Sequence, residues 1–158
     1  MIDMSNRRDK AFSLLEVVIV VAIIAILAAI GIPRMSRGSK GANDSAVSGN
    51  LAVLRNAIDL YSAEHGGSFP TAADIGDQLT QYTNISGGTS TAKTTTHIYG
   101  PYVRSIPPLP VGVRKGQNGI AAGDANDVGW IYTVASGDIR ANTFTGEDDE
   151  AGTAYSDY

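Results

Sequence analysis

Glu16 is the only charged residue in the apolar stretch from Phe12 to Pro33. A carboxylate within a membrane span costs about 2–3 kcal/mol at mid-membrane depth, less near the interface, and usually serves a function. In surroundings of low dielectric such a carboxylate needs a cation as its partner. The alternative is an interfacial charge whose side chain reaches the lipid headgroups.

Two acidic segments contain residues that could bind a hard cation, because calcium prefers carboxylate and amide oxygens. "GDANDVG" (residues 123–129) orders its acidic and amide side chains partly like a calcium loop, and "TGEDDE" (residues 145–150) is a cluster of carboxylates. The alternative for the second segment is a solvated acidic tail. Calcium is the one cofactor that the sequence suggests, and the candidate ligands are Asp124, Asp127, Asp148 and Asp149.

Other chemistry finds no support in the sequence. The formal net charge of −4 and the absence of a basic face argue against nucleic-acid binding. The chain has no cysteine, which excludes disulfides, thiolate zinc sites and cysteine nucleophiles. Its two histidines lack neighbours that suggest a triad or a metal site, and no catalytic motif stands out. We therefore expect a protein that is not an enzyme.

The stretch that holds Glu16 is long enough to cross a membrane. As a helix, residues 12–33 would extend roughly 33 Å, about the thickness of the hydrocarbon core. Three positive residues flank it on each side, so charge counting does not fix its orientation: they are Arg7, Arg8 and Lys10 before it, and Arg34, Arg37 and Lys40 after it. A secretory signal cut before Ile32, or a passive signal anchor, would also fit the apolar residues, but neither explains Glu16.

The stretch "KAFSLLEVVIVVAIIAILAAIGIP" resembles the N-terminal signature of type IV pilins and of the pseudopilins of type II secretion. The resemblance implies that a prepilin peptidase cuts between Ala11 and Phe12, although the family prefers glycine at the position of Ala11. The new α-amine at Phe12, commonly methylated, would then supply the cation for Glu16 of a neighbouring subunit. Pro33 matches the proline near the end of the family's span, where the helix stretches or unwinds in filaments; alternatively, it only ends the span.

After the span, apolar residues recur at spacings of four and three residues, which draws one stripe along an amphipathic helix: Val47, Leu51, Leu54, Ile58 and Tyr61. The sequence "HGG" at residues 65–67 is a typical end for this helix. The helix either begins afresh at a cap formed by Asn43 or Asp44, or continues from the apolar span.

The remainder of the chain has weaker signals. Thr71 and Asp74 suggest a capping box for a short helix that ends near Tyr82, and residues 83–97 are expected to form a polar surface loop. Strands are predicted at 99–106, at 130–134 and at 139–143, the last two joined by a turn at 136–138. These strands would form a small antiparallel sheet that covers the helix stripe. "GPYVRSIPPLPVG", "GWIYTVASGDI" and "TGEDDE" resemble the sheet region and the calcium loop of the major pseudopilin.

We therefore expect an α+β, pilin-like fold with four parts: a leader (residues 1–11), a transmembrane and filament-core helix (12–33), an amphipathic helix continuing into the head (34–66), and a globular head (67–158). The resemblance implies a pseudopilin that assembles with itself and other pilin-like subunits, after cleavage by prepilin peptidase, on a platform in the bacterial inner membrane, with its head in the periplasm. The alternatives are a type IV pilin of a surface filament, and a secreted or anchored binding protein or enzyme that uses the apolar run only for export.

Overall fold

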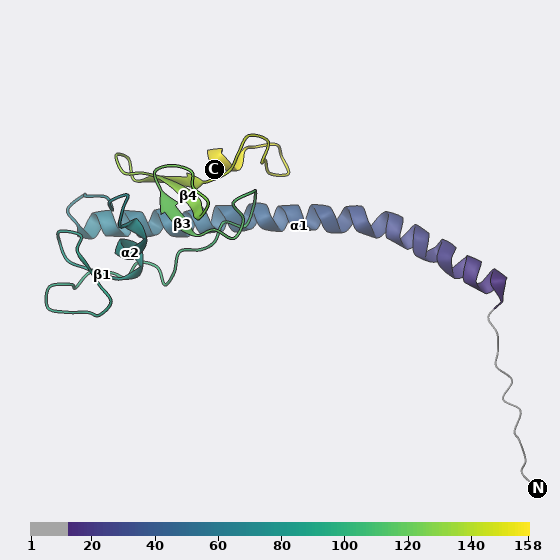
Figure 1. Ribbon diagram of the computed structural model, residues 1–158, viewed down its shortest axis with the longest axis horizontal. Coiled ribbons are helices and arrows are strands. Elements are labelled where there is room, and N and C mark those ends of the chain that lie inside the picture. The colour runs from purple at the N-terminus through teal and green to yellow at the C-terminus, as the bar shows by residue number, and fades with distance from the viewer. Residues whose placement is uncertain (1–12) are drawn as a thin grey trace, which may run out of the picture. The chain divides into compact units, whose positions relative to one another are not determined.

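The computed structural model describes residues 13–158, and over residues 30–39 it describes the backbone alone. The chain divides into two compact units, Met1–Gly38 and Ser39–Tyr158. Helix α1 (Leu14–Glu64) begins in the first unit and ends in the second (Figure 1). We call Ser39–Tyr158 the head, and each unit is described by itself.

Helix α1 is a single α-helix from Leu14 to Glu64. The backbone remains helical through Pro33 and through both Gly38 and Gly41. The possibility of a fresh start at Asn43 or Asp44 is therefore wrong, because both residues lie in the helix interior.

The end of α1 follows the sequence signal. Gly66 and Gly67 have φ values of 65° and 88°, which favour glycine. The amide of Gly67 donates a hydrogen bond of 2.8 Å to the carbonyl of Ser62, as in a Schellman motif. This arrangement satisfies a carbonyl of the last turn and stops the helix at the predicted place.

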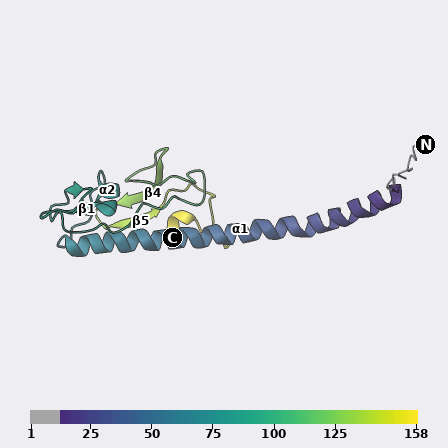
Figure 2. The same cartoon turned by 90° about the horizontal axis from the view of Figure 1, so that it is seen from below.

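One face of α1 forms the floor of the head's core. The five residues of the predicted stripe, from Val47 to Tyr61, are between 0% and 3% exposed, which confirms the helical periodicity. Figure 2 shows α2, β4 and β5 on one side of this part of α1. The stripe belongs to a cluster with buried side chains from the rest of the head, among them Leu79, Leu109, Trp130, Tyr132 and Ile139.

The predicted hairpin is present. Strand β4 (Val128–Thr133) pairs with β5 (Asp138–Ala141) in antiparallel register, with Trp130 opposite Ala141. The pattern of burial in β5 alternates, as expected for a strand with one face on the core.

The third strand differs from the prediction. Residues 99–106 form no strand, and only Tyr99 makes an isolated bridge to Thr83. Pro101 cannot donate to a sheet ladder, which explains part of the failure. The third strand is β3 (Gly119–Ala121), which pairs in parallel with β4, so the sheet is mixed rather than antiparallel. Gly129 permits close approach here, because a Cβ would lie 2.2 Å from the carbonyl oxygen of Gln117.

The short helix and the polar loop also differ in detail. Helix α2 (Ile75–Thr80) begins after Asp74, and the hydroxyl of Thr71 bonds the Asp74 carboxylate instead of capping the helix backbone. Two short antiparallel strands lie at the start of the predicted loop and within it, β1 (Tyr82–Thr83) and β2 (Thr89–Ser90). A 3-10 helix, η1 (Tyr155–Asp157), lies near the end of the chain.

Candidate functional site

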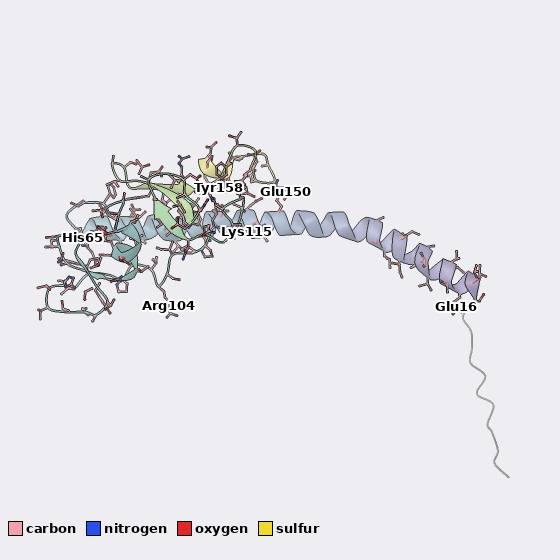
Figure 3. All side chains as sticks on the ribbon, in the orientation of Figure 1. Glu16, His65, Arg104, Lys115, Glu150 and Tyr158 are labelled. Carbon is pink, nitrogen blue, oxygen red and sulfur yellow. The ribbon has the colours of Figure 1, made fainter. Side chains whose placement is uncertain are left out.

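Glu16 lies in the first turn of α1 and is exposed (Figure 3). A negative charge is favoured there by the partial positive charge of the helix N-terminus. Among the residues whose side chains the structure describes (13–29 and 40–158), the only salt bridge joins Arg114 to Asp124, so Glu16 has no cationic partner within those residues. Its predicted partner, the amine of Phe12, and the residue before the predicted cut, Ala11, lie outside the described residues.

The surface around Glu16 is apolar on every side of the helix. The large apolar residues from Leu14 to Leu27 are between 49% and 82% exposed. A surface helix of a soluble domain normally has one polar face, whereas an apolar surface on all sides is typical of a helix buried in an assembly or in lipid. The apolar side chains of this segment are therefore not buried by other described residues, whereas those of the head's core are.

The predicted span itself remains an expectation. Among the residues whose side chains the structure describes, no helix is long and apolar enough to cross a membrane. Pro33 lies in the helical backbone, and its side chain is outside the description. The role of Pro33 in helix stretching also stays a prediction.

Asp124, the first calcium candidate, binds an arginine. Nε and Nη2 of Arg114 donate to its two carboxylate oxygens, each at 2.8 Å, and Nη1 donates to the amide oxygen of Asn126 at 2.9 Å. The side-chain amide of Asn142 donates a hydrogen bond to the Asp124 carboxylate at 2.8 Å. The Arg114 guanidinium, followed by the Asn142 amide, holds the pKa of Asp124 below its usual value. Asp127 is exposed, and its backbone carbonyl accepts a bond from the Gly119 amide.

Asp149, in the second acidic segment, is also occupied by protein donors. The Tyr158 hydroxyl donates to one of its carboxylate oxygens at 2.5 Å, and the Thr153 amide donates to the other at 2.7 Å. These two bonds, the tyrosine first, lower the pKa of Asp149. The same contact raises the pKa of Tyr158 to about 12. Asp148 is partly buried and lines an open cavity of about 290 Å³ together with Lys40, Lys115 and Glu147.

The structure does not gather the predicted calcium ligands into one site. Within residues 13–158, apart from the side chains of 30–39, no three histidine or acidic residues are placed to hold a metal ion. The oxygens of Asp124 and Asp149 already accept hydrogen bonds from N–H and O–H groups. Calcium takes six to eight oxygen ligands, and the four candidates are divided between two segments that do not meet in such a cluster, so this donor set does not fit calcium.

The sequence did not reveal the roles that Asp44, Glu147 and Arg55 have in this region. Asp44, on α1, accepts a hydrogen bond from the Tyr155 hydroxyl, and burial followed by this bond raises the pKa of Tyr155. Glu147 accepts from the amides of Val113 and Phe144 at 2.6 and 2.8 Å, and Arg55 donates to the carbonyls of Ile139 and Tyr158. The partners of Asp44 and Arg55 are 84 or more residues away, and no local pattern marks such pairs.

Comparison with known proteins bears on the N-terminal segment. No curated protein and no solved structure matches the chain. Residues 6–32 match the prokaryotic N-terminal methylation motif, which is found in type IV pilins and pseudopilins. The motif includes Ala11, Phe12 and Glu16. It supports a processed, structural subunit of the type IV pilin or pseudopilin kind that assembles with other such subunits.

Proposed function

We propose that this chain is a pseudopilin of type II secretion. Prepilin peptidase removes residues 1–11, and the mature chain begins at Phe12 and assembles into a helical filament. The observation that carries the proposal is the methylation motif, in which Glu16 occupies the first turn of a helix that is apolar on all sides.

The apolar surface supports both stages of this function. A helix has its backbone hydrogen bonds satisfied internally, so it can lie in hydrocarbon without penalty. Before assembly the lipid of the inner membrane covers residues 12–33, and the head lies in the periplasm. In the filament, the same segments of neighbouring subunits cover one another, and the change of surroundings requires no refolding of the head.

Glu16 sets how neighbouring subunits align with one another in this assembly. Cleavage leaves an ammonium group at Phe12, and the Glu16 carboxylate of the next subunit neutralises it. In a bundle of low dielectric an unpaired charge is strongly unfavourable, so the pair selects the arrangement that brings the two charges together. The pair contributes more to alignment than to net stability.

Two features favour a secretion pseudopilin over a surface pilin. The sheet region and the acidic loop resemble the major pseudopilin, and the chain has no cysteine, whereas the C-terminal loop of adhesive pilins is often closed by a disulfide. The filament would then move folded cargo outward, energised by a cytoplasmic ATPase and seated on a membrane platform.

The test combines protein chemistry with imaging. The chain is expressed with a prepilin peptidase and the assembly platform, extracted from membranes, and analysed by N-terminal sequencing and intact mass. We expect a chain that begins at methylated Phe12. A chain that begins at Ile32 indicates ordinary signal cleavage, one that begins at Met1 indicates an unprocessed anchor, and either result contradicts the proposal.

In the same experiment Glu16→Leu separates processing from assembly. This variant should be inserted and cut like the wild type, because Glu16 lies beyond the cut, yet it should form few or no filaments in electron micrographs. Glu150→Gln is the matched control, because it removes an exposed negative charge of the head whose carboxylate accepts no hydrogen bond from the described residues. Normal filaments from Glu16→Leu would show that the charge pair is not needed.

A further inference from the structure

The last residues of the head are held on α1 by hydrogen bonds. We call residues 144–158 the C-terminal latch. Its first anchor is Asp44, whose two carboxylate oxygens accept bonds from the Tyr155 hydroxyl and from the Glu150 amide, the latter at 3.1 Å. Tyr155 is 4% exposed, so the bond to Asp44 is made at the edge of the core. Figure 3 labels Glu150 and Tyr158, the ends of the last part of the latch.

The second anchor is Arg55. Its Nη2 donates to the carbonyl oxygen of Tyr158 and, at 3.2 Å, to that of Ile139 in β5. Asp44 and Arg55 are about three helical turns apart and therefore lie on the same side of α1. The two anchors fix the latch at two separate heights along the helix.

Two carboxylates inside the latch, those of Asp149 and Glu147, also accept hydrogen bonds from the protein. Asp149 binds the Tyr158 hydroxyl and the Thr153 amide, which draws the two ends of residues 149–158 together. Glu147 binds the amides of Phe144 and Val113, which ties the start of the latch to the loop before β3. The aromatic rings of Tyr155 and Tyr158 meet edge to face, with centroids 5.6 Å apart.

These contacts perform the task that a divalent cation performs in an acidic loop. A cation closes such a loop by binding six to eight oxygens at roughly 2.3–2.6 Å and neutralising their charge. Here the oxygens of Asp44, Asp149 and Glu147 meet O–H and N–H groups, and bonds from such donors to a carboxylate are among the strong ones. A cation at these oxygens would compete with the O–H and N–H donors, and a donor that it displaced would be left without a partner.

We propose that tyrosine hydroxyls and backbone amides, in place of calcium, close the C-terminal latch and hold it on α1, so that the head folds equally well with and without the ion. The calcium loop implied by the resemblance to major pseudopilins is thus replaced, in this chain, by a metal-independent closure. The inference concerns the folding of the head and does not rest on the proposed filament.

The test measures thermal unfolding of the full chain in detergent, followed by the near-ultraviolet circular dichroism of its tyrosines and tryptophan. The melting temperature should be the same in excess EDTA and in excess calcium chloride. Tyr155→Phe and Tyr158→Phe should each lower it by about 2–4 °C in both buffers, because each removes one hydrogen bond to a carboxylate. Tyr82→Phe is the matched control, since the Tyr82 hydroxyl makes no hydrogen bond to the described residues, and it should leave the melting temperature unchanged.

Limited proteolysis gives a second measurement that is local to the latch. Cleavage within residues 144–158 should be faster in the two latch variants than in Tyr82→Phe, and equally fast with EDTA or calcium. A wild-type melting temperature that falls in EDTA and recovers with calcium would overturn the proposal. So would latch variants that melt and are cleaved like Tyr82→Phe, because the hydroxyls would then hold nothing.

Discussion

The two parts of helix α1 have the same backbone and opposite surroundings. From Leu14 to Leu27 every large apolar side chain is about half exposed or more, whereas the stripe from Val47 to Tyr61 is almost completely buried. The first part is apolar all round, whereas the second buries one apolar face and leaves only Val53 and Leu60 as exposed large apolar side chains. Helix formation is therefore common to both, and the difference lies in what covers the side chains.

This difference separates two sources of free energy. Burying a large apolar side chain stabilises a fold by about 1.5–3 kcal/mol, and in the head this burial occurs within one chain. The exposed surface of the first part contributes no such stabilisation in a single subunit. Their gain comes only from lipid or from other subunits, which makes the first part an element of assembly and the second an element of folding.

The largest expected effect comes from exchanging one leucine in each part. Leu54 is 0% exposed, and Leu54→Ala should lower the free energy of unfolding of the head by about 2–5 kcal/mol because it leaves a cavity. Leu27 is 64% exposed, and Leu27→Ala should leave that free energy within about 0.5 kcal/mol of the wild type. Chemical denaturation in detergent, followed by tryptophan fluorescence, measures both, and a loss from Leu27→Ala as large as that from Leu54→Ala would abolish the distinction.

A smaller effect is expected at high pH, and again only in the head, which contains all seven tyrosines. Burial raises the pKa of Tyr132 from 10.0 to about 12, so the folded head keeps a proton that the unfolded chain releases. The contribution is complete below pH 10 and is lost as the pH rises from 10 to 12. Melting temperatures should fall across this interval, and less steeply in Tyr132→Phe; a parallel fall in both proteins would assign the loss to other groups.

Local patterns in the sequence predicted the local parts of the fold. The stripe at spacings of four and three residues identified the buried face of α1, because that spacing holds side chains on one side of a helix. The glycines after His65 marked its end, and the turn before β5 marked the hairpin. The methylation motif, which carries the candidate processing site, was also visible in consecutive residues.

The remaining features depend on residues that are distant in sequence. Strand β3 has three residues and contains a glycine, so it has no alternation to detect, and its parallel pairing depends on the position of β4. Residues 99–106 include β-forming side chains, but Pro101 interrupts the ladder, and Tyr102 and Val103 instead donate backbone bonds to Leu79. The hydrogen bond between Asp44 and Tyr155 joins residues 111 positions apart. Nothing in the sequence around a single aspartate in a helix identifies so distant a partner.

The smallest effect is expected from Gly49→Ala, a substitution that tests whether the outer face of α1 in the head serves folding or assembly. Gly49 lies in the helix, and a Cβ added there would meet nothing within 4 Å. Gly49→Ala should therefore stabilise the head by about 0.5–1 kcal/mol, because alanine is the better helix former and restricts the unfolded chain. Chemical denaturation measures this gain, and a loss of stability would show that the position is not free.

Assembly of the same variant sharpens the comparison. If the outer face of the second part is only solvated, Gly49→Ala should form filaments like the wild type while its head is more stable. If filaments fail although the head is stabilised, neighbouring subunits approach Gly49 closely, and the outer face belongs to assembly as the first part of α1 does. The stability of the isolated subunit and the yield of filaments would then change in opposite directions, which a purely structural role in the head does not produce.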